Sequence, residues 1–325
     1  GELGMKELDV ITFGEPMNMF YANEVEPLHE AKSFSRAIAG AESNVACGLA
    51  RLDLNVAYMT KLGDDSFGKF IIGELNKEKV DTTGIRFTSD HPTGMLIKSK
   101  VHDGDPEVEY FRKNSAASTL NIDDLSEEYF RQAKHLHATG IPSALSESCH
   151  EFTVAAMKLM RNKGKTVSFD PNLRPNLWPD KQKMVACINE LAYICDLFLP
   201  GMSEAEVLTG LRTPEEVAEF YLNKGVKMIV IKLGAEGAYY KNANEEGYVK
   251  GFVPEKVIDT VGAGDGFAVG VISGLLEGKS MLETVTRGNA IGALQVMAPG
   301  DMDGMPSRKK LQDFIESQNK LLNVE

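Results

Sequence analysis

The sequence alternates short apolar runs that favour strands with longer stretches that show the hydrophobic periodicity of helices. The strand-like runs span residues 9–14, 56–62, 166–170, 197–200 and 228–233. The helical patterns occupy residues 43–52, 67–78, 149–163, 180–194, 213–224, 264–277 and 281–296. This order predicts an α/β fold, a doubly wound and mostly parallel sheet flanked by helices. Ligands of such sheets gather at the carboxyl ends of the strands.

Two stretches, residues 15–38 and 93–113, break the alternation. The second contains two extended patterns, 93–101 and 107–112, separated by a turn-forming segment rich in Asp, Gly and Pro, and therefore predicts a hairpin. Both stretches are too short to form a domain. The length of 325 residues suits one large or two modest domains, and no internal repeat or long linker divides the chain. We expect a single domain over residues 1–325, with these stretches inserted in it.

The composition narrows the class of protein. The chain is 43% hydrophobic and carries a formal net charge of −12, so a nucleic acid would meet repulsion over most of the surface. No apolar run reaches membrane-spanning length and no signal peptide is evident, which predicts a cytoplasmic protein without a membrane partner. The four cysteines lie in apolar patterns without metal-binding spacing. The partner indicated is a small molecule.

Residues 259–267 read Asp-Thr-Val-Gly-Ala-Gly-Asp-Gly-Phe and run directly into an apolar helical pattern. The small residues Gly262, Ala263 and Gly264 let several backbone N–H groups point the same way, at the positive end of a helix, which suits a phosphate anion. The carboxylate of Asp265 would repel a phosphate. Its position here therefore indicates another task, such as taking a proton from an attacking hydroxyl. The alternative is an ordinary glycine-rich turn with an acidic helix cap.

This segment resembles the C-terminal signature of the ribokinase-like (PfkB) sugar kinases. The resemblance extends from Gly14 to Asp301 and includes 39–46 and 61–68, which look like the N-terminal signature of the family. It implies an ATP- and Mg²⁺-dependent kinase, with the anion hole at residues 262–264 and Asp265 as the catalytic base. A requirement for a monovalent cation stays open. The resemblance also implies that residues 15–38 and 93–113 build a small β lid over the sugar.

The nucleotide side is assigned mostly by the same resemblance. The segment 232–237 follows a strand and should turn sharply, and the family places ATP contacts there, which implies Lys232, Gly234 and Gly237 as cofactor-binding residues. Asn289 matches a position near the adenine pocket. Gly201 stands where the family has an Asn linked to magnesium handling, and Glu204 remains as an indirect metal residue.

Polar residues and backbone positions suited to a sugar come from separate parts of the chain. Gly40 and Ala41 carry little bulk, and Asn44 can both donate to and accept from a hydroxyl or instead cap a helix. A planar guanidinium can hold a carboxylate through two charge-assisted hydrogen bonds, or form a simple surface salt bridge. The resemblance adds Asp301, which matches a substrate-side position of the family. The predicted substrate-binding residues are Gly40, Ala41, Asn44, Tyr110, Arg112, Asp170, Asn172, Arg174, Asp265 and Asp301.

Several segments resemble the subgroup that phosphorylates the sugar acid 2-keto-3-deoxygluconate, among them 14–17, 39–42 and 110–118. We therefore expect transfer of phosphate from ATP to the terminal hydroxyl of that acid, giving its 6-phosphate. The alternatives are a fructokinase or other sugar kinase of the family, and a sensor that binds nucleotide or sugar without catalysis. We also expect a homo-oligomer, for which a dimer through the lid is one arrangement.

Overall fold

The computed structural model describes residues 7–322 and contains an eight-stranded sheet. Its strands, in spatial order, are β14 (Glu246–Val249), β13 (Ala238–Asn242), β12 (Met228–Lys232), β11 (Leu197–Phe198), β10 (Thr166–Asp170), β9 (Ala133–Thr139), β1 (Leu8–Phe13) and β4 (Val56–Met59). The run from β12 to β4 is parallel, and β13 and β14 add antiparallel strands at one edge. The predicted mostly parallel α/β sheet is confirmed.

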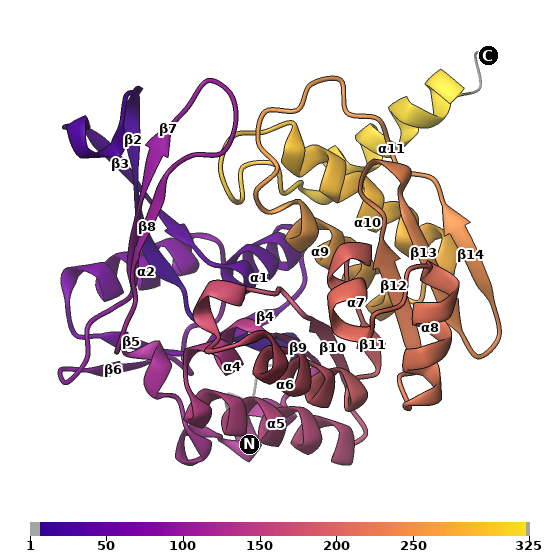
Figure 1. Ribbon diagram of the computed structural model, residues 1–325, viewed down its shortest axis with the longest axis horizontal. Coiled ribbons are helices and arrows are strands. Elements are labelled where there is room, and N and C mark those ends of the chain that lie inside the picture. Colours follow the sequence, from indigo (N-terminus) through magenta and orange to yellow (C-terminus); the bar gives the residue numbers. More distant parts are fainter. Residues whose placement is uncertain (1–6, 323–325) are drawn as a thin grey trace.

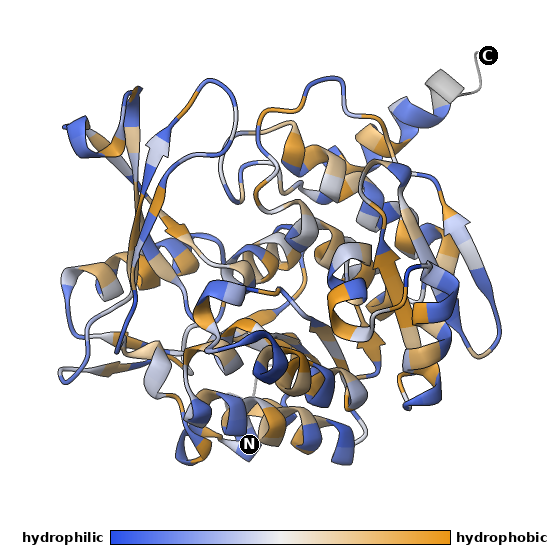
Figure 2. Cartoon of the chain, viewed as in Figure 1, coloured by the Kyte–Doolittle hydropathy of each residue, from blue (hydrophilic) through white to orange (hydrophobic). Residues whose placement is uncertain are grey.

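Helices cover both faces of this sheet (Figure 1). One face packs against α1 (Ala41–Arg51), α2 (Ser66–Lys77), α9 (Ala263–Leu276), α10 (Met281–Val296) and α11 (Arg308–Leu322). The other packs against α3 (Glu127–Arg131), α4 (Ile141–Leu145), α5 (Glu147–Asn162), α6 (Lys181–Tyr193), α7 (Met202–Thr209) and α8 (Pro214–Asn223). Figure 2 shows the apolar strands between these two layers. Burial on both sides explains why the strands are almost continuously hydrophobic.

A second sheet stands apart from the main one, at the upper left of Figure 1. Its order is β3 (Phe34–Ala39), β2 (Met17–Val25), β7 (Met95–Lys100) and β8 (Val108–Phe111), and β7 and β8 form the predicted antiparallel hairpin. A small apolar cluster of Met17, Met19, Ala39 and Leu96 lies on one face of it. Both stretches that interrupt the alternation in the sequence contribute strands to this sheet.

The local predictions hold at most positions. Residues 166–170 and 281–296 coincide with β10 and α10, and the other predicted helices are displaced by no more than two residues at either end. The prediction of one strand over residues 56–62 is wrong. These residues form β4 in the main sheet and β5 (Lys61–Gly63), which pairs with β6 (Arg86–Thr88) in a separate two-stranded sheet. An apolar run does not reveal that the chain changes sheet at Thr60.

Helix α9 is fixed in place by close packing on α10. A Cβ atom on Gly270 would overlap the backbone nitrogen of Gly288, and one on Gly274 would lie 2.8 Å from Thr284 Oγ1. Glycines at these positions therefore let the two helix backbones approach closely. The body of α9, whose first turn carries the residue 262–265 segment, is thereby held on α10. Within residues 7–322, none of the helices combines the length and the apolar character needed to span a bilayer.

Candidate active site

A cavity of about 140 Å³ lies between the carboxyl ends of the main strands and the four-stranded sheet. Its lining consists of Glu15, Met17, Ala39, Gly40, Ala41, Glu42, Asn44, Leu96, Tyr110, Arg112, Ile141, Arg174, Val261, Gly262, Asp265 and Asp301. Eight of the ten residues predicted to bind substrate are in this list. The cavity therefore brings together side chains and backbone from the N-terminal, central and C-terminal parts of the chain.

Asp265 lies in the first turn of α9 and is 8% exposed. Its Oδ2 atom accepts a hydrogen bond of 2.9 Å from Asn44 Nδ2, which joins the first turn of α1 to that of α9. Burial raises the pKa of Asp265 to about 7, although the bond from Asn44 and the charges of Lys232 and Arg174 act in the opposite direction. A carboxyl group with this pKa can both take up and release a proton near neutral pH.

The turn before Asp265 has the shape of an anion-binding loop. Gly262 has φ +79°, and a Cβ there would lie 2.5 Å from the carbonyl oxygen of Asp301, so a larger residue would not fit. The first N–H groups of α9 have no partner within their own helix. Lys232 Nζ lies 3.5 Å from where a Cβ on Gly264 would stand, which places an ammonium group beside the turn. Glycine backbone, helix terminus and Lys232 together favour a phosphate here.

Lys232 ends β12 and is paired with Asp170 at the end of β10. Its Nζ lies 3.3 Å from Asp170 Oδ2, and Asp170 is 2% exposed on its side chain. Burial alone would lower the pKa of Lys232, but the carboxylates of Asp170, Glu204 and Asp265 outweigh it and the pKa is raised. Lys232 therefore keeps its charge. Asp170 is absent from the cavity lining, so its observed contact is with Lys232 rather than with the cavity.

Glu204 is held by backbone groups. Its Oε1 atom accepts a hydrogen bond from the Gly201 N–H at 3.0 Å, and its Oε2 atom accepts one from the Leu173 N–H at 3.0 Å. These bonds cap α7 and secure the loop after β10. Asn172, in the same loop, has φ +39° and lies outside the cavity lining. In the described chain, no group of three His, Cys, Asp or Glu residues is arranged to hold a metal ion.

The two arginines of the cavity differ in their partners. Arg112 Nε donates to Glu15 Oε1 at 2.7 Å, and the side chains are 12% and 1% exposed. Arg174 is exposed and donates from Nη1 to the neighbouring Leu173 carbonyl at 3.1 Å. Tyr110 lies on β8 with its ring 5.5 Å from the Arg112 guanidinium carbon. Glu15 thus balances the charge of Arg112, and Arg174 presents the less compensated cation.

The predicted nucleotide residues Gly237 and Asn289 meet at one short backbone segment at the end of β14. A Cβ on Gly237 would overlap the Val249 carbonyl oxygen, and Asn289 Nδ2 donates to the Val249 and Lys250 carbonyls at 3.2 and 3.3 Å. Gly234 has φ +63° and open space around its α carbon. None of these three residues lines the cavity around Asp265.

Sequence reasoning missed two buried acids of the cavity, Glu15 and Glu42. Glu42 is 1% exposed, and burial raises its pKa to about 7 despite a 2.8 Å hydrogen bond from Thr139 Oγ1. Its Oε2 atom has no hydrogen-bond partner among the described residues. Glu42 falls in the segment 39–46 that the resemblance singled out. The pattern there indicates a role for the small residues and for Asn44, but not for the carboxyl group of Glu42.

Gln295 on α10 is a second omission. It is completely buried, and its Nε2 atom donates to the carbonyls of Gly262 at 3.2 Å and Asp301 at 2.6 Å. Its Oε1 atom accepts from the Gly304 N–H at 2.9 Å. One amide therefore joins the anion-binding turn to the loop that carries Asp301. The sequence offers no signal for this role, because a glutamine within an amphipathic helix is usually solvent-facing.

Replacing Gln295 by Leu should leave the Asp301 carbonyl and the Gly304 N–H unpaired, while the Gly262 carbonyl keeps only its bond from the Gly266 N–H. We expect the free energy of unfolding to fall by about 2 kcal/mol and turnover to fall with it, since buried unpaired polar groups cost about 1–3 kcal/mol. Urea unfolding and steady-state kinetics would measure both. Gln312→Leu, on the exposed face of α11, is the matched control. Equal, small changes in the two variants would contradict the role of Gln295.

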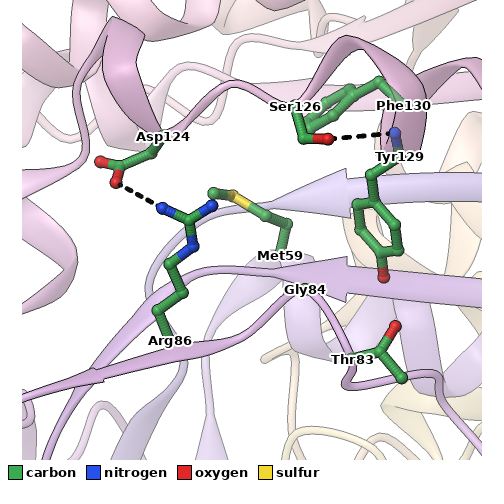
Figure 3. A pocket seen from close by; sticks show the side chains of 8 residues that line it. All are labelled: Met59, Thr83, Gly84, Arg86, Asp124, Ser126, Tyr129 and Phe130. Carbon is green, nitrogen blue, oxygen red and sulfur yellow. Dashed lines mark hydrogen bonds and ion pairs between the residues drawn. The ribbon is translucent and has the colours of Figure 1, made fainter.

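A separate cavity of about 190 Å³ lies beside β4 and β6 (Figure 3). The carboxylate of Asp124 is held there by Lys61 at 2.8 Å and Arg86 at 3.5 Å, and the Tyr129 hydroxyl donates to Asp81 Oδ1 at 3.1 Å. These polar groups satisfy one another. None of the predicted site residues lines this cavity, whereas eight of the predicted substrate-binding residues line the one around Asp265.

Comparison with known proteins identifies the family of this chain. The chain is 58% identical to the 2-dehydro-3-deoxygluconokinase of Bacillus subtilis (strain 168), over 96% of this chain and 97% of the relative. The crystal structure of a PfkB protein from Polaromonas sp. JS666 superposes with a TM-score of 0.88 at 47% identity, covering 94% of this chain and 99% of that one. An E. coli protein provisionally designated ribokinase II, in complex with ATP and Mg²⁺, superposes with a TM-score of 0.88 at 27% identity, covering 95% and 99%. Residues 7–308 match the pfkB family of carbohydrate kinases, and the chain belongs to that family.

Proposed function

We propose that this protein transfers a phosphoryl group from ATP to the terminal hydroxyl of the sugar acid 2-keto-3-deoxygluconate. The observation that carries the proposal is the arrangement of the cavity around Asp265. A carboxyl with a pKa of about 7 stands at the anion-binding turn, and the guanidinium groups of Arg112 and Arg174 line the same small space. The 58% identity to a 2-dehydro-3-deoxygluconokinase supports the same substrate.

In this proposal Asp265 takes the proton from the attacking hydroxyl. Asn44 holds Oδ2 of the carboxylate, which leaves Oδ1 free to accept that proton. The backbone N–H groups at the start of α9 neutralise the charge that develops on the transferred phosphoryl group, since this reaction depends mostly on positioning and electrostatics. Lys232, beside Gly264, adds a fixed positive charge on the same side.

The residues present fit ATP with Mg²⁺. Gly262 holds the turn in a conformation with φ +79°, a Cβ on Gly264 would stand 3.5 Å from Lys232 Nζ, and the described residues hold no cluster of acids that could bind the metal alone. Mg²⁺ would therefore be held chiefly by the phosphates, where it neutralises their charge. Both Glu204 oxygens are engaged by backbone N–H groups, so Glu204 would act on the metal only indirectly.

A neutral sugar such as fructose is the second candidate, and one observation favours it. The cavity is lined by four acids, Glu15, Glu42, Asp265 and Asp301, and two arginines, which would disfavour an anionic substrate if all were ionised. Burial, however, raises the pKa of Glu42 to about 7 and that of Asp301 to about 6, so the acids carry less than their full charge near neutral pH. The acid substrate is therefore compatible with the cavity.

The discriminating experiment is ADP release from the purified protein with 2-keto-3-deoxygluconate, 2-keto-3-deoxygalactonate, fructose, ribose and gluconate. Turnover with the first is the expected result. Turnover confined to fructose would establish the second candidate. A protein that binds nucleotide yet releases no ADP with any of the five would be a sensor without catalysis.

The raised pKa of Asp265 predicts how activity depends on pH. The base must be ionised, so kcat/KM should rise with pH and level off above an apparent pKa of about 7. The pKa values of Glu42 and Asp301 are also raised, to about 7 and about 6. The apparent pKa of the rise in kcat/KM therefore belongs to the three acids together. Initial rates across the range from weakly acidic to weakly alkaline pH, with coupling enzymes in excess, would measure it. A flat profile over this range would contradict the assignment of Asp265.

We further infer that the four-stranded sheet is a lid that closes over the sugar, because Met17, Leu96 and Tyr110 of that sheet line the cavity. We also infer that the protein is a homo-oligomer, with a dimer through the lid. Phe34 and Phe111 on this sheet are 36% and 54% exposed, which supports an additional partner surface there. Light scattering during size-exclusion chromatography would determine the mass.

A further inference from the structure

One ion pair joins the four-stranded sheet to the loop that leads into α9. Lys98 Nζ, on β7, lies 3.7 Å from Asp259 Oδ2, and the two side chains are only 15% and 25% exposed. The residues are far apart in the sequence, and Figure 1 shows the upper end of β7 on the same side of the molecule as the loop before α9. A shielded pair of this kind is screened less by salt than a fully exposed one.

The sheet geometry explains why Lys98 reaches this loop. Leu96 and Lys98 are two residues apart on β7 and therefore point to the same face. Leu96 pairs with Tyr110 across β7 and β8, and both line the cavity. Lys98 therefore continues the cavity-facing surface of the lid toward its rim.

Asp259 uses its other oxygen to build the turn. Its Oδ1 atom accepts a hydrogen bond of 2.9 Å from the Val261 N–H, immediately before Gly262. Val261 and Gly262 both line the cavity. The backbone N–H groups of Ile258 and Asp259 donate to the Val296 carbonyl, which ties the same loop to α10. One carboxylate thus contacts the lid on one side and shapes the anion-binding turn on the other.

Other acids also face the Lys98 ammonium group. Asp301 is close enough for Lys98 to lower its pKa, while burial, Asp259 and Asp303 raise it, to about 6 overall. Asp301 also lines the cavity. The lid lysine therefore enters a region rich in carboxylates at the mouth of the site, where its charge stabilises the closed arrangement most when the acids are ionised.

We propose that Lys98 is a positioning residue that couples closure of the lid over the sugar to ordering of the anion-binding turn, through Asp259. The structure shows Lys98 in contact with Asp259. Sugar bound under the lid stabilises this closed arrangement, and so keeps the Val261 turn in the shape that receives phosphate. The sugar and the nucleotide then each strengthen the binding of the other, by the same factor. The proposal depends on the inferred lid, but not on which sugar is the substrate.

The test measures this coupling directly. The dissociation constant of a non-hydrolysable ATP analogue with Mg²⁺ is determined by calorimetry, with and without saturating 2-keto-3-deoxygluconate. The sugar should tighten analogue binding by about 5-fold or more in the parent protein and by about 2-fold or less in Lys98→Met, a range typical of coupled sites. If that sugar does not bind, the proposed substrate is wrong, and the sugar that the ADP-release assay selects takes its place.

Three further variants separate the pair from general effects. Lys98→Arg keeps the charge and should retain the coupling. Asp259→Asn keeps the acceptor for Val261 but removes the charge, so it should lose the coupling as Lys98→Met does, and the double variant should be no worse. Lys100→Met, two residues along the same strand and exposed, is the matched control. Loss of coupling in Lys100→Met equal to that in Lys98→Met would overturn the proposal.

Hydrogen exchange supplies a readout that does not depend on turnover. Sugar should slow exchange at the amides of residues 257–262 in the parent protein and in Lys98→Arg, but not in Lys98→Met. Amides near residues 40–44 should be protected in all three proteins, which reports sugar binding itself. Protection at 40–44 together with unchanged coupling in Lys98→Met would show that Lys98 has no such role.

Discussion

Replacing Asp265 by Asn should lower kcat by about 10²-fold to 10⁴-fold, because general base catalysis contributes an acceleration of this size. The amide keeps the shape of the side chain but cannot take the proton. Nucleotide binding should be largely retained, because the backbone at residues 262–264 is unchanged. Steady-state ADP release and calorimetry with a non-hydrolysable analogue would measure the two quantities.

The same substitution should have the opposite effect on stability. Because burial raises the pKa of the Asp265 carboxyl in the folded protein, binding of a proton to this group favours folding. This stabilisation is fully present below the pKa of the group in the unfolded chain, and it is lost as pH rises through about 7. At a pH of about 8 the Asp265→Asn variant avoids a buried charge, so its unfolding should require on the order of 1–3 kcal/mol more than that of the parent protein. The difference should vanish at a pH of about 4, near the ordinary pKa of an aspartate. Near-normal turnover, or lower stability at the alkaline pH, would refute the assigned role.

Replacing Arg174 by Lys should lower kcat/KM for 2-keto-3-deoxygluconate by roughly 10-fold to 100-fold, about 1.4 to 2.7 kcal/mol. Lysine keeps the charge but lacks the planar fork that binds a carboxylate through two hydrogen bonds. Arg174 is the better choice of the two arginines because Glu15 already occupies Arg112 Nε at 2.7 Å. Steady-state kinetics should show the loss mainly in KM.

Controls for this prediction come from the same cavity. Activity on a neutral sugar, where measurable, should change less in Arg174→Lys, and equal losses on both substrates would indicate general damage. Robust phosphorylation of fructose by the parent protein, with none of the keto-deoxy acid, would replace the proposed substrate.

The central part of the site could be predicted from the sequence because its residues are local. Gly262, Gly264 and Asp265 lie within four residues, and a glycine turn that runs into an apolar helix has few other structures available. The carboxyl ends of the strands could also be predicted from the sequence, which places Asp170 and Lys232 at the same edge of the sheet. Their mutual ion pair could not be predicted, since no pattern in the sequence links β10 to β12.

Contacts between distant segments could not be read from the sequence. The amide of Gln295 is polar within a helix, and only the fold shows that it is buried against two loops. Glu15 and Glu42 are acids near small residues, and their burial follows from the lid and from Thr139 on β9. Interactions of this kind depend on tertiary packing, which the local periodicity does not encode.

The contact between Gly270 and Gly288 leaves no room for α9 to slide on α10. The body of α9, which carries Asp265, is thus fixed in position, whereas the sugar side is built partly on short strands with few buried neighbours. New substrate preferences can then arise by exchange of residues such as Leu96 or Tyr110, without disturbing the chemistry at Asp265. The protein separates the part that must stay constant from the part that can diversify, and a single scaffold can in this way serve many sugars.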